Sequence, residues 1–168
     1  MAISETKTGT ITPTAAEFAL SLSLRLLKYQ GLMTPRLTST FGPIRAEQRS
    51  LEAVGSTYLR KSRLISVADG TCILDAELHL VSKNLPTALI ASLSETSILF
   101  GQLLLDYGMA VDVALPKLFQ TSDNRFGRRT SITDTKTARL VCDVKETMAH
   151  DSILNSLAAG YENVQSLI

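Results

Sequence analysis

The 168-residue sequence has no tryptophan, only 5% aromatic residues, two histidines and two cysteines. It therefore has few of the aromatic side chains on which nucleic-acid bases and sugars stack in proteins. The formal net charge is only +1, so no excess of positive charge attracts nucleic acid or an anionic membrane. We expect neither nucleic acid nor a membrane as a partner.

The cysteines, Cys72 and Cys142, both lie in apolar segments of strand-like composition. Two thiols and two histidines do not have the spacing of a zinc site, so we expect no metal. The polar residues 1–10 do not have the pattern of a signal peptide, and the apolar segment 18–27 is too short to span a bilayer. We expect a cytoplasmic protein with reduced thiols.

Hydrophobic residues make up 45% of the chain, which is typical of an ordered protein with a substantial core. We expect residues 1–11 to form a polar arm and residues 12–168 to form a single domain. Thr14 and Glu17 have the spacing of a capping box, which predicts the start of a helix that continues to Tyr29 and ends at Gly31.

Alternation of polar and apolar residues predicts a β-hairpin next, with an Asp69-Gly70 turn. Its strands are predicted at 58–67 and 71–81, whereas residues 32–41, with Pro35, are expected to be broken and loop-like. Further helices are predicted at 85–93, 97–107 and 148–164, and further strands at 109–119, 126–133 and 138–145. Pro116 would have to lie at an edge or a bulge. This order of elements predicts an α+β fold with an antiparallel sheet.

Several short segments follow one another in a characteristic order. They are Met33-Thr34-Pro35-Arg36, Leu59-Arg60, Phe100-Gly101, Gly127-Arg128-Arg129-Thr130, and the apolar run Leu140-Val141-Cys142 that ends on Asp143. In this order and at nearly these spacings, the segments resemble the chorismate pyruvate-lyase family. The resemblance extends from about residue 20 to about residue 155.

The resemblance implies a single antiparallel sheet of about six strands with flanking helices, which encloses the ligand. It also implies a lyase that needs no cofactor and eliminates pyruvate from chorismate to give 4-hydroxybenzoate, a step of ubiquinone biosynthesis. Arg60 would hold a carboxylate of the substrate, and Met33 and the backbone around Phe100 would line the pocket. Asp143 would replace the catalytic glutamate of the family, so Arg60 and Asp143 are the expected catalytic residues.

Alternatives remain for both catalytic positions. Arg63 competes with Arg60, but Arg60 lies an odd number of positions before Glu77, as in the family, and a change of parity would turn the side chain to the other face of the strand. Both arginines could also be surface charges. Asp143 is one methylene shorter than glutamate and could simply cap a turn, and Glu146 is a second acid on the opposite face of the strand.

Of the adjacent Arg128 and Arg129, we expect one to point inward and one outward, with one of them in a structural ion pair or serving as a second anion anchor. Other functions are also open: a ligand-sensing domain of a transcription regulator, another elimination or pericyclic step, or a non-catalytic domain that binds a small anionic molecule. The sequence leaves both a monomer and a small homo-oligomer possible.

Overall fold

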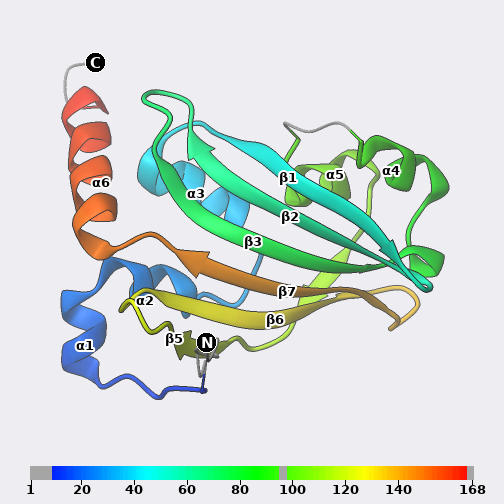
Figure 1. Ribbon diagram of the computed structural model, residues 1–168, viewed down its shortest axis with the longest axis horizontal. Coiled ribbons are helices and arrows are strands. Elements are labelled where there is room, and N and C mark those ends of the chain that lie inside the picture. The colour runs from blue at the N-terminus through cyan, green and yellow to red at the C-terminus, as the bar shows by residue number, and fades with distance from the viewer. Residues whose placement is uncertain (1–8, 95–97, 166–168) are drawn as a thin grey trace, which may run out of the picture.

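A computed structural model describes residues 9–94 and 98–165. The fold is α+β, with one antiparallel sheet of seven strands that does not close into a barrel (Figure 1). The strand order is β1-β2-β3-β7-β6-β4, and β5 also pairs with β6. The strands are β1 (Ile44–Val54), β2 (Thr57–Ser66), β3 (Cys72–Val81), β4 (Val111–Val113), β5 (Lys117–Gln120), β6 (Phe126–Asp134) and β7 (Leu140–Met148). The predicted fold class is therefore confirmed.

The helices lie around this sheet, with α3 behind it in the view of Figure 1 and α6 along one end. They are α1 (Ala15–Leu20), α2 (Leu22–Leu27), α3 (Met33–Phe41), α4 (Thr87–Ser92), α5 (Phe100–Asp106) and α6 (Asp151–Gln165), with a short 3₁₀ turn at Ser82–Asn84. None of the helices in residues 9–94 and 98–165 is long and apolar enough to cross a membrane.

The predicted capping box is present at the start of α1. The Thr14 hydroxyl accepts from the Glu17 N–H, and the Glu17 carboxylate accepts from the Thr14 N–H, each at 3.2 Å. The single helix predicted from here to Tyr29 is interrupted at Ser21, where the backbone is extended. The Ser21 side chain caps α2 by accepting from Leu24 N–H, and it donates to Asp151 at the start of α6 at 2.7 Å.

Three expectations about the elements were wrong. Residues 33–41 form a regular helix, because Pro35 lies in its first turn, where the missing N–H would have no helical partner. The predicted strand 109–119 is divided into β4 and β5 around Pro116. The first strand, β1, was not predicted, and a bulge between Gln48 and Ser50 breaks its alternation.

The ends of two predicted segments fall partly outside the described residues: residues 1–8 of the expected arm, and Ser97 at the expected start of a helix. The described end of the arm is attached to the sheet. Ile11 N–H donates to Leu118 O at 2.9 Å, and Thr10 forms a bridge with Phe119.

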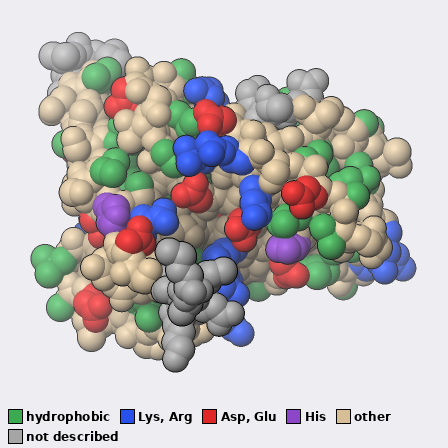
Figure 2. Space-filling model, in the orientation of Figure 1, with side chains coloured by type: hydrophobic (Ala, Val, Ile, Leu, Met, Phe, Trp, Pro, Cys, Tyr) green, Lys and Arg blue, Asp and Glu red, His purple; other side chains and the backbone are tan. Residues whose placement is uncertain are grey.

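The two faces of the sheet differ in polarity. The outer face carries acidic and basic side chains next to one another (Figure 2), including the pairs Lys61–Glu77 and Arg63–Asp75. The inner face packs against helices and contains two apolar clusters, one under α2, α3 and α6 and one under α4 and α5. One solvated face and one buried face are usual for an antiparallel sheet.

Candidate functional site

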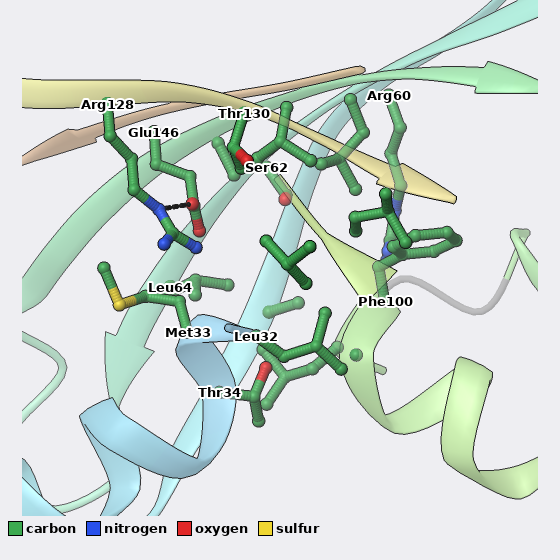
Figure 3. Close-up of a pocket in the computed structure, with 18 of the residues that line it drawn as sticks. Leu32, Met33, Thr34, Arg60, Ser62, Leu64, Phe100, Arg128, Thr130 and Glu146 are labelled. Carbon is green, nitrogen blue, oxygen red and sulfur yellow. Dashed lines mark hydrogen bonds and ion pairs between the residues drawn. The ribbon is translucent and has the colours of Figure 1, made fainter. Parts of the chain in front are cut away.

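A cavity lies between the two apolar clusters, enclosed by the inner face of the sheet and the first residues of α3 and α5 (Figure 3). Most of its wall is apolar, and its polar groups come mainly from β2, β6 and β7. The apolar lining includes Leu32, Met33, Ala46, Leu64, Ala76, Leu78, Leu99, Phe100, Val113, Ile132 and Val144, and the polar lining includes Thr34, Arg60, Ser62, Arg128, Thr130 and Glu146. The cavity volume is about 50 Å³.

Arg60 is a buried cation at one end of this cavity. Its side chain is 1% exposed. Its Nε donates to the Gln48 side-chain oxygen and its Nη2 to the carbonyl oxygen of Ile98, both at 2.8 Å. Both acceptors are neutral, and the structure gives Arg60 no carboxylate partner among the described residues. Burial lowers the pKa of the guanidinium, but arginine remains charged in proteins.

Arg128, at the other end of the cavity, is fully paired. Its Nε donates to Glu146 Oε1 at 2.6 Å, and its other nitrogens donate to the carbonyl oxygens of Tyr29 at 2.7 Å and Gly31 at 3.0 Å. Arg128 and Glu146 lie directly opposite one another on β6 and β7, and both are buried. The expected inward arginine in a structural ion pair is therefore Arg128, while Arg129 is exposed on the outer face.

Two hydroxyl groups lie between these charged ends. Thr130 donates to the carbonyl oxygen of Ala114 at 2.6 Å and is satisfied. Ser62, two residues after Arg60 on the same face of β2, is 5% exposed and forms no side-chain hydrogen bond within the described parts of the chain. Figure 3 shows its side chain between the Arg60 end and the Arg128–Glu146 end.

The structure brings three of the four predicted site residues into one wall: Met33, Arg60 and Phe100 all line the cavity. The fourth, Asp143, does not. It is exposed on the outer face of β7, beside His79 on β3, and therefore faces away from Arg60. The placement of Asp143 in the cavity was wrong because side chains alternate along a strand, and the neighbours that point inward from β7 are Val144 and Glu146.

The same alternation explains why Arg60, and not Arg63, faces the cavity. Arg63 lies an odd number of residues from Arg60 and points to the outer face, where it is half-exposed and pairs with Asp75 at 3.6 Å. The inward residues of β2 are Arg60, Ser62 and Leu64, all buried.

Glu146 was expected only as a second acid, and Thr130 only as part of the segment Gly127-Arg128-Arg129-Thr130. Ser62 and Gln48 were not predicted as site residues. Ser62 could have been found, because it follows Arg60 at the two-residue spacing of one strand face. Gln48 could not, because β1 was not predicted and the contact crosses between strands.

The described residues contain no group of three or more histidine, cysteine or acidic side chains that could hold a metal. Both cysteines are free: Cys142 is buried and Cys72 is partly buried. The polar groups of the cavity suit other chemistry: Arg60 can bind an anion, the Ser62 hydroxyl can donate or accept a hydrogen bond, and the Glu146 carboxylate can accept one.

Comparison with known proteins assigns no family. No protein-family model and no curated protein matches the sequence. The structure is similar to the crystal structure of possible transcriptional regulator YydK from Bacillus subtilis subsp. subtilis str. 168, with a TM-score of 0.47 and 9% identity over 73% of this chain and 64% of that chain. The chain thus spans less than two thirds of that neighbour, and a likeness of this degree does not indicate a function.

The predicted membership of the chorismate pyruvate-lyase family is contradicted by these findings and is wrong. Packing explains segments of the apparent signature without any family relationship. A side chain at Gly127 would collide with the ring of Phe119, and one at Gly101 would approach the Thr34 hydroxyl to 2.9 Å. Arg128 is needed to pair with Glu146. The chain is thus an α+β protein with a cavity on the inner face of its sheet and no assigned family.

Proposed function

We propose that the chain binds a small, single-ring carboxylic acid in the cavity, with the carboxylate on Arg60. The observation that carries this proposal is that Arg60 is buried with no carboxylate partner in residues 9–94 and 98–165. A buried charge costs several kcal/mol unless a counter-charge compensates it, and the neighbours of Arg60 are an amide oxygen and a backbone carbonyl. A bound carboxylate would supply the missing negative charge and could accept two parallel N–H bonds from the guanidinium.

The rest of the cavity supports an apolar body for this ligand. Apolar side chains from the sheet and from α3 and α5 surround the space between the polar groups. Helix α3 begins at the cavity wall and has no side-chain cap at its N-terminus, so its partial positive charge also favours an anion. Ligand clefts commonly measure about 300–1,000 Å³. The cavity volume of about 50 Å³ therefore favours a small ligand whose entry moves side chains of the wall.

The direct test is calorimetric titration of the purified chain with benzoate. We expect binding that is weakened at least about 30-fold in Arg60→Met, since truncating one partner of a buried charge pair costs about 2–5 kcal/mol. Arg63→Met is the matched control, because it removes an arginine from the same strand but from the outer face, and it should bind as the unchanged protein does. Absence of benzoate binding, or an equal loss in both variants, would refute the proposal.

A second candidate function is the elimination of pyruvate from chorismate, and the position of Glu146 favours it. Its carboxylate lines the same cavity as Arg60, on the inner face of β7. In this reaction the bond between the ring carbon and the ether oxygen breaks, and the neighbouring ring carbon loses its proton, so the ring becomes aromatic. The released enolpyruvate takes up a proton to become pyruvate. Arg60 would hold a carboxylate, and Glu146 would be the acid or base within reach of the ring.

Incubation with chorismate and enzymatic detection of pyruvate tests this second function. Pyruvate release should depend on Arg60 and should be unchanged in Asp143→Asn, since Asp143 faces the opposite side of the sheet. If benzoate binds and no pyruvate appears above the spontaneous rate, the chain is a binding protein and the elimination is excluded.

A further inference from the structure

A second cavity lies at one end of the sheet, as a groove between one face of α6, the end of α3 and the β2–β3 turn (Figure 1). Its volume is about 620 Å³, and ligand clefts commonly measure about 300–1,000 Å³. We propose that this space, the α6 groove, binds an apolar molecule with an amine group, which donates to the Ser66 hydroxyl and the Asp69 carboxylate. The inference does not depend on the proposed function, because no described residue lines both cavities.

The walls of the α6 groove are mostly apolar. Ile153, Leu157, Tyr161 and Val164 lie three or four positions apart, so they share one face of α6. Ile153 is 42% exposed and Val164 is 60% exposed, so the described parts of the chain leave much of this face uncovered. Gly160 lies on the same face, where a Cβ would meet nothing within 4 Å. These walls suit the apolar body of a ligand.

Ser66 is a buried polar group that faces this groove. Its side chain is 1% exposed, and its hydroxyl has no hydrogen-bond partner in residues 9–94 and 98–165. Buried polar groups are nearly always hydrogen-bonded, because an unsatisfied one loses its bonds to water without replacement. A polar group on the ligand would supply the missing partner.

Asp69 decides the charge of that polar group. It is the single charged residue of the described lining, which contains no lysine, arginine or histidine. Hydrogen bonds, chiefly from the Thr71 N–H at 2.9 Å, lower the pKa of the Asp69 carboxyl, so it is ionised at neutral pH. The Ser66 hydroxyl contributes to this lowering, and the two groups are therefore close, although no hydrogen bond joins them. A carboxylate only accepts and a hydroxyl can accept, so an ammonium group with its three donors can bond to both.

The size of the groove guides the choice of probe. A volume of about 620 Å³ equals that of about 20 water molecules in the liquid, which is ample for a ring on a short chain. The probe is 4-phenylbutylamine, and 4-phenylbutan-1-ol is the matched uncharged compound.

The first experiment is calorimetric titration of the purified chain and two variants with both compounds. Ser66→Ala should weaken binding of the amine about 10-fold or more, because a hydrogen bond from a charged donor is lost. Asp69→Asn should weaken it only about 3-fold, since Asp69 is exposed, and should leave the affinity for the alcohol unchanged. Asparagine can still accept from the Thr71 N–H, so the turn is retained.

The second experiment fills the groove instead of changing its polar groups. In Gly160→Leu the new side chain should occupy the space and abolish binding of the amine. Ala159→Leu is the matched control, because it adds the same side chain to the next residue of α6, which is exposed and outside the described lining of the groove. Leucine favours a helix more than glycine does, so α6 should be preserved in both variants. Saturating benzoate should not change the affinity for the amine.

The proposal is refuted if the amine does not bind to the unchanged protein, or if binding survives Gly160→Leu or Ser66→Ala in variants whose thermal unfolding shows that they are folded. Equal affinities for the amine and the alcohol, both insensitive to Asp69→Asn, would refute an amine as the ligand class. Light scattering tests a different occupant: a dimer that Gly160→Leu dissociates, together with no binding of the amine, would show that a second copy of the chain fills the groove and would also refute the proposal. Failure of benzoate to bind would refute the proposed function and leave this inference standing.

Discussion

The two fully buried arginines, Arg60 and Arg128, should differ in how much the free energy of unfolding decreases when each is replaced by methionine. Arg60 and Arg128 both point inward from the sheet and are 1% and 2% exposed. They differ in what surrounds them: Arg128 has the carboxylate of Glu146 at 2.6 Å, whereas the acceptors of Arg60 among the described residues are all neutral. Methionine is a suitable replacement since it is unbranched and fills irregular apolar space.

For Arg128→Met, we expect a large decrease in the free energy of unfolding. The change leaves the buried carboxylate of Glu146 without its counter-charge, and the carbonyl oxygens of Tyr29 and Gly31 lose their donor. Breaking a buried ion pair by removing one partner costs about 3–5 kcal/mol. That is a large fraction of the total free energy of unfolding of a typical domain, about 5–15 kcal/mol.

For Arg60→Met, two effects nearly cancel. The change removes two hydrogen bonds from a charged donor, each worth about 1.5–3 kcal/mol, and leaves the acceptors on Gln48 and Ile98 unpaired. It also removes the penalty of several kcal/mol for burying a charge that no carboxylate of the described chain neutralises. We therefore expect a free energy of unfolding within about 1 kcal/mol of that of the unchanged protein, and a loss that is at least about 2 kcal/mol smaller than for Arg128→Met.

Urea unfolding followed by far-ultraviolet circular dichroism measures both effects, since the chain has no tryptophan for fluorescence. Benzoate at about 100 times its dissociation constant should stabilise the unchanged protein by about 2.7 kcal/mol, and should not stabilise Arg60→Met. If Arg60→Met is as unstable as Arg128→Met, Arg60 is a structural residue with a compensated charge, and the reasoning that leads from its unpaired burial to an anionic ligand is refuted.

Two further predictions concern other parts of the molecule. Burial raises the pKa of the Cys142 thiol well above its usual value. The folded state therefore binds the thiol proton more tightly than the unfolded state does. Below the unfolded pKa of about 8.5 the thiol is protonated in both states, and above it the free energy of unfolding decreases as the pH rises towards the folded pKa. The fall in the free energy of unfolding above that pH should be smaller in Cys142→Ala, and an unchanged slope would contradict this. Gly127→Ala should cost about 1–3 kcal/mol, because the new Cβ would meet the Phe119 ring and lie 2.5 Å from the main-chain oxygen of Glu146. Gly160→Ala in α6, where a Cβ meets nothing within 4 Å, should instead stabilise the chain by up to about 1 kcal/mol in the same assay, and equal losses in both variants would refute the packing argument.

The elements predicted correctly are those whose signals are local. The Asp69-Gly70 turn between alternating segments specifies the β2–β3 hairpin, and Gly70 has the positive φ of 76° that such a turn requires. The Thr14–Glu17 capping box likewise depends on residues within one turn of helix. Neither signal needs information about the rest of the chain.

The errors arose where the outcome depended on distant contacts. Strand β1 has a bulge and many charged residues, and it becomes a strand by pairing along most of β2. The predicted site required an acid on β7 that faces Arg60. Asp143 and Glu146 both follow the apolar segment of β7, and the sequence did not show which of them points inward. The order of the short segments suggested the chorismate pyruvate-lyase family. In this fold, however, Gly101 and Gly127 lie where a side chain would collide with a neighbour, and Arg128 pairs with Glu146.

The sequence by itself determined the class of fold and most of the helices and strands, because periodicity and turn chemistry act within a few residues of one another. Only the tertiary structure decided that Glu146 rather than Asp143 shares the cavity and that Glu146 is paired with Arg128. It also decided that Arg60 is buried without a carboxylate partner in the part of the chain that the structure describes. These facts depend on strand register and on which neighbours cover each face, and both are set by contacts between residues far apart in the chain.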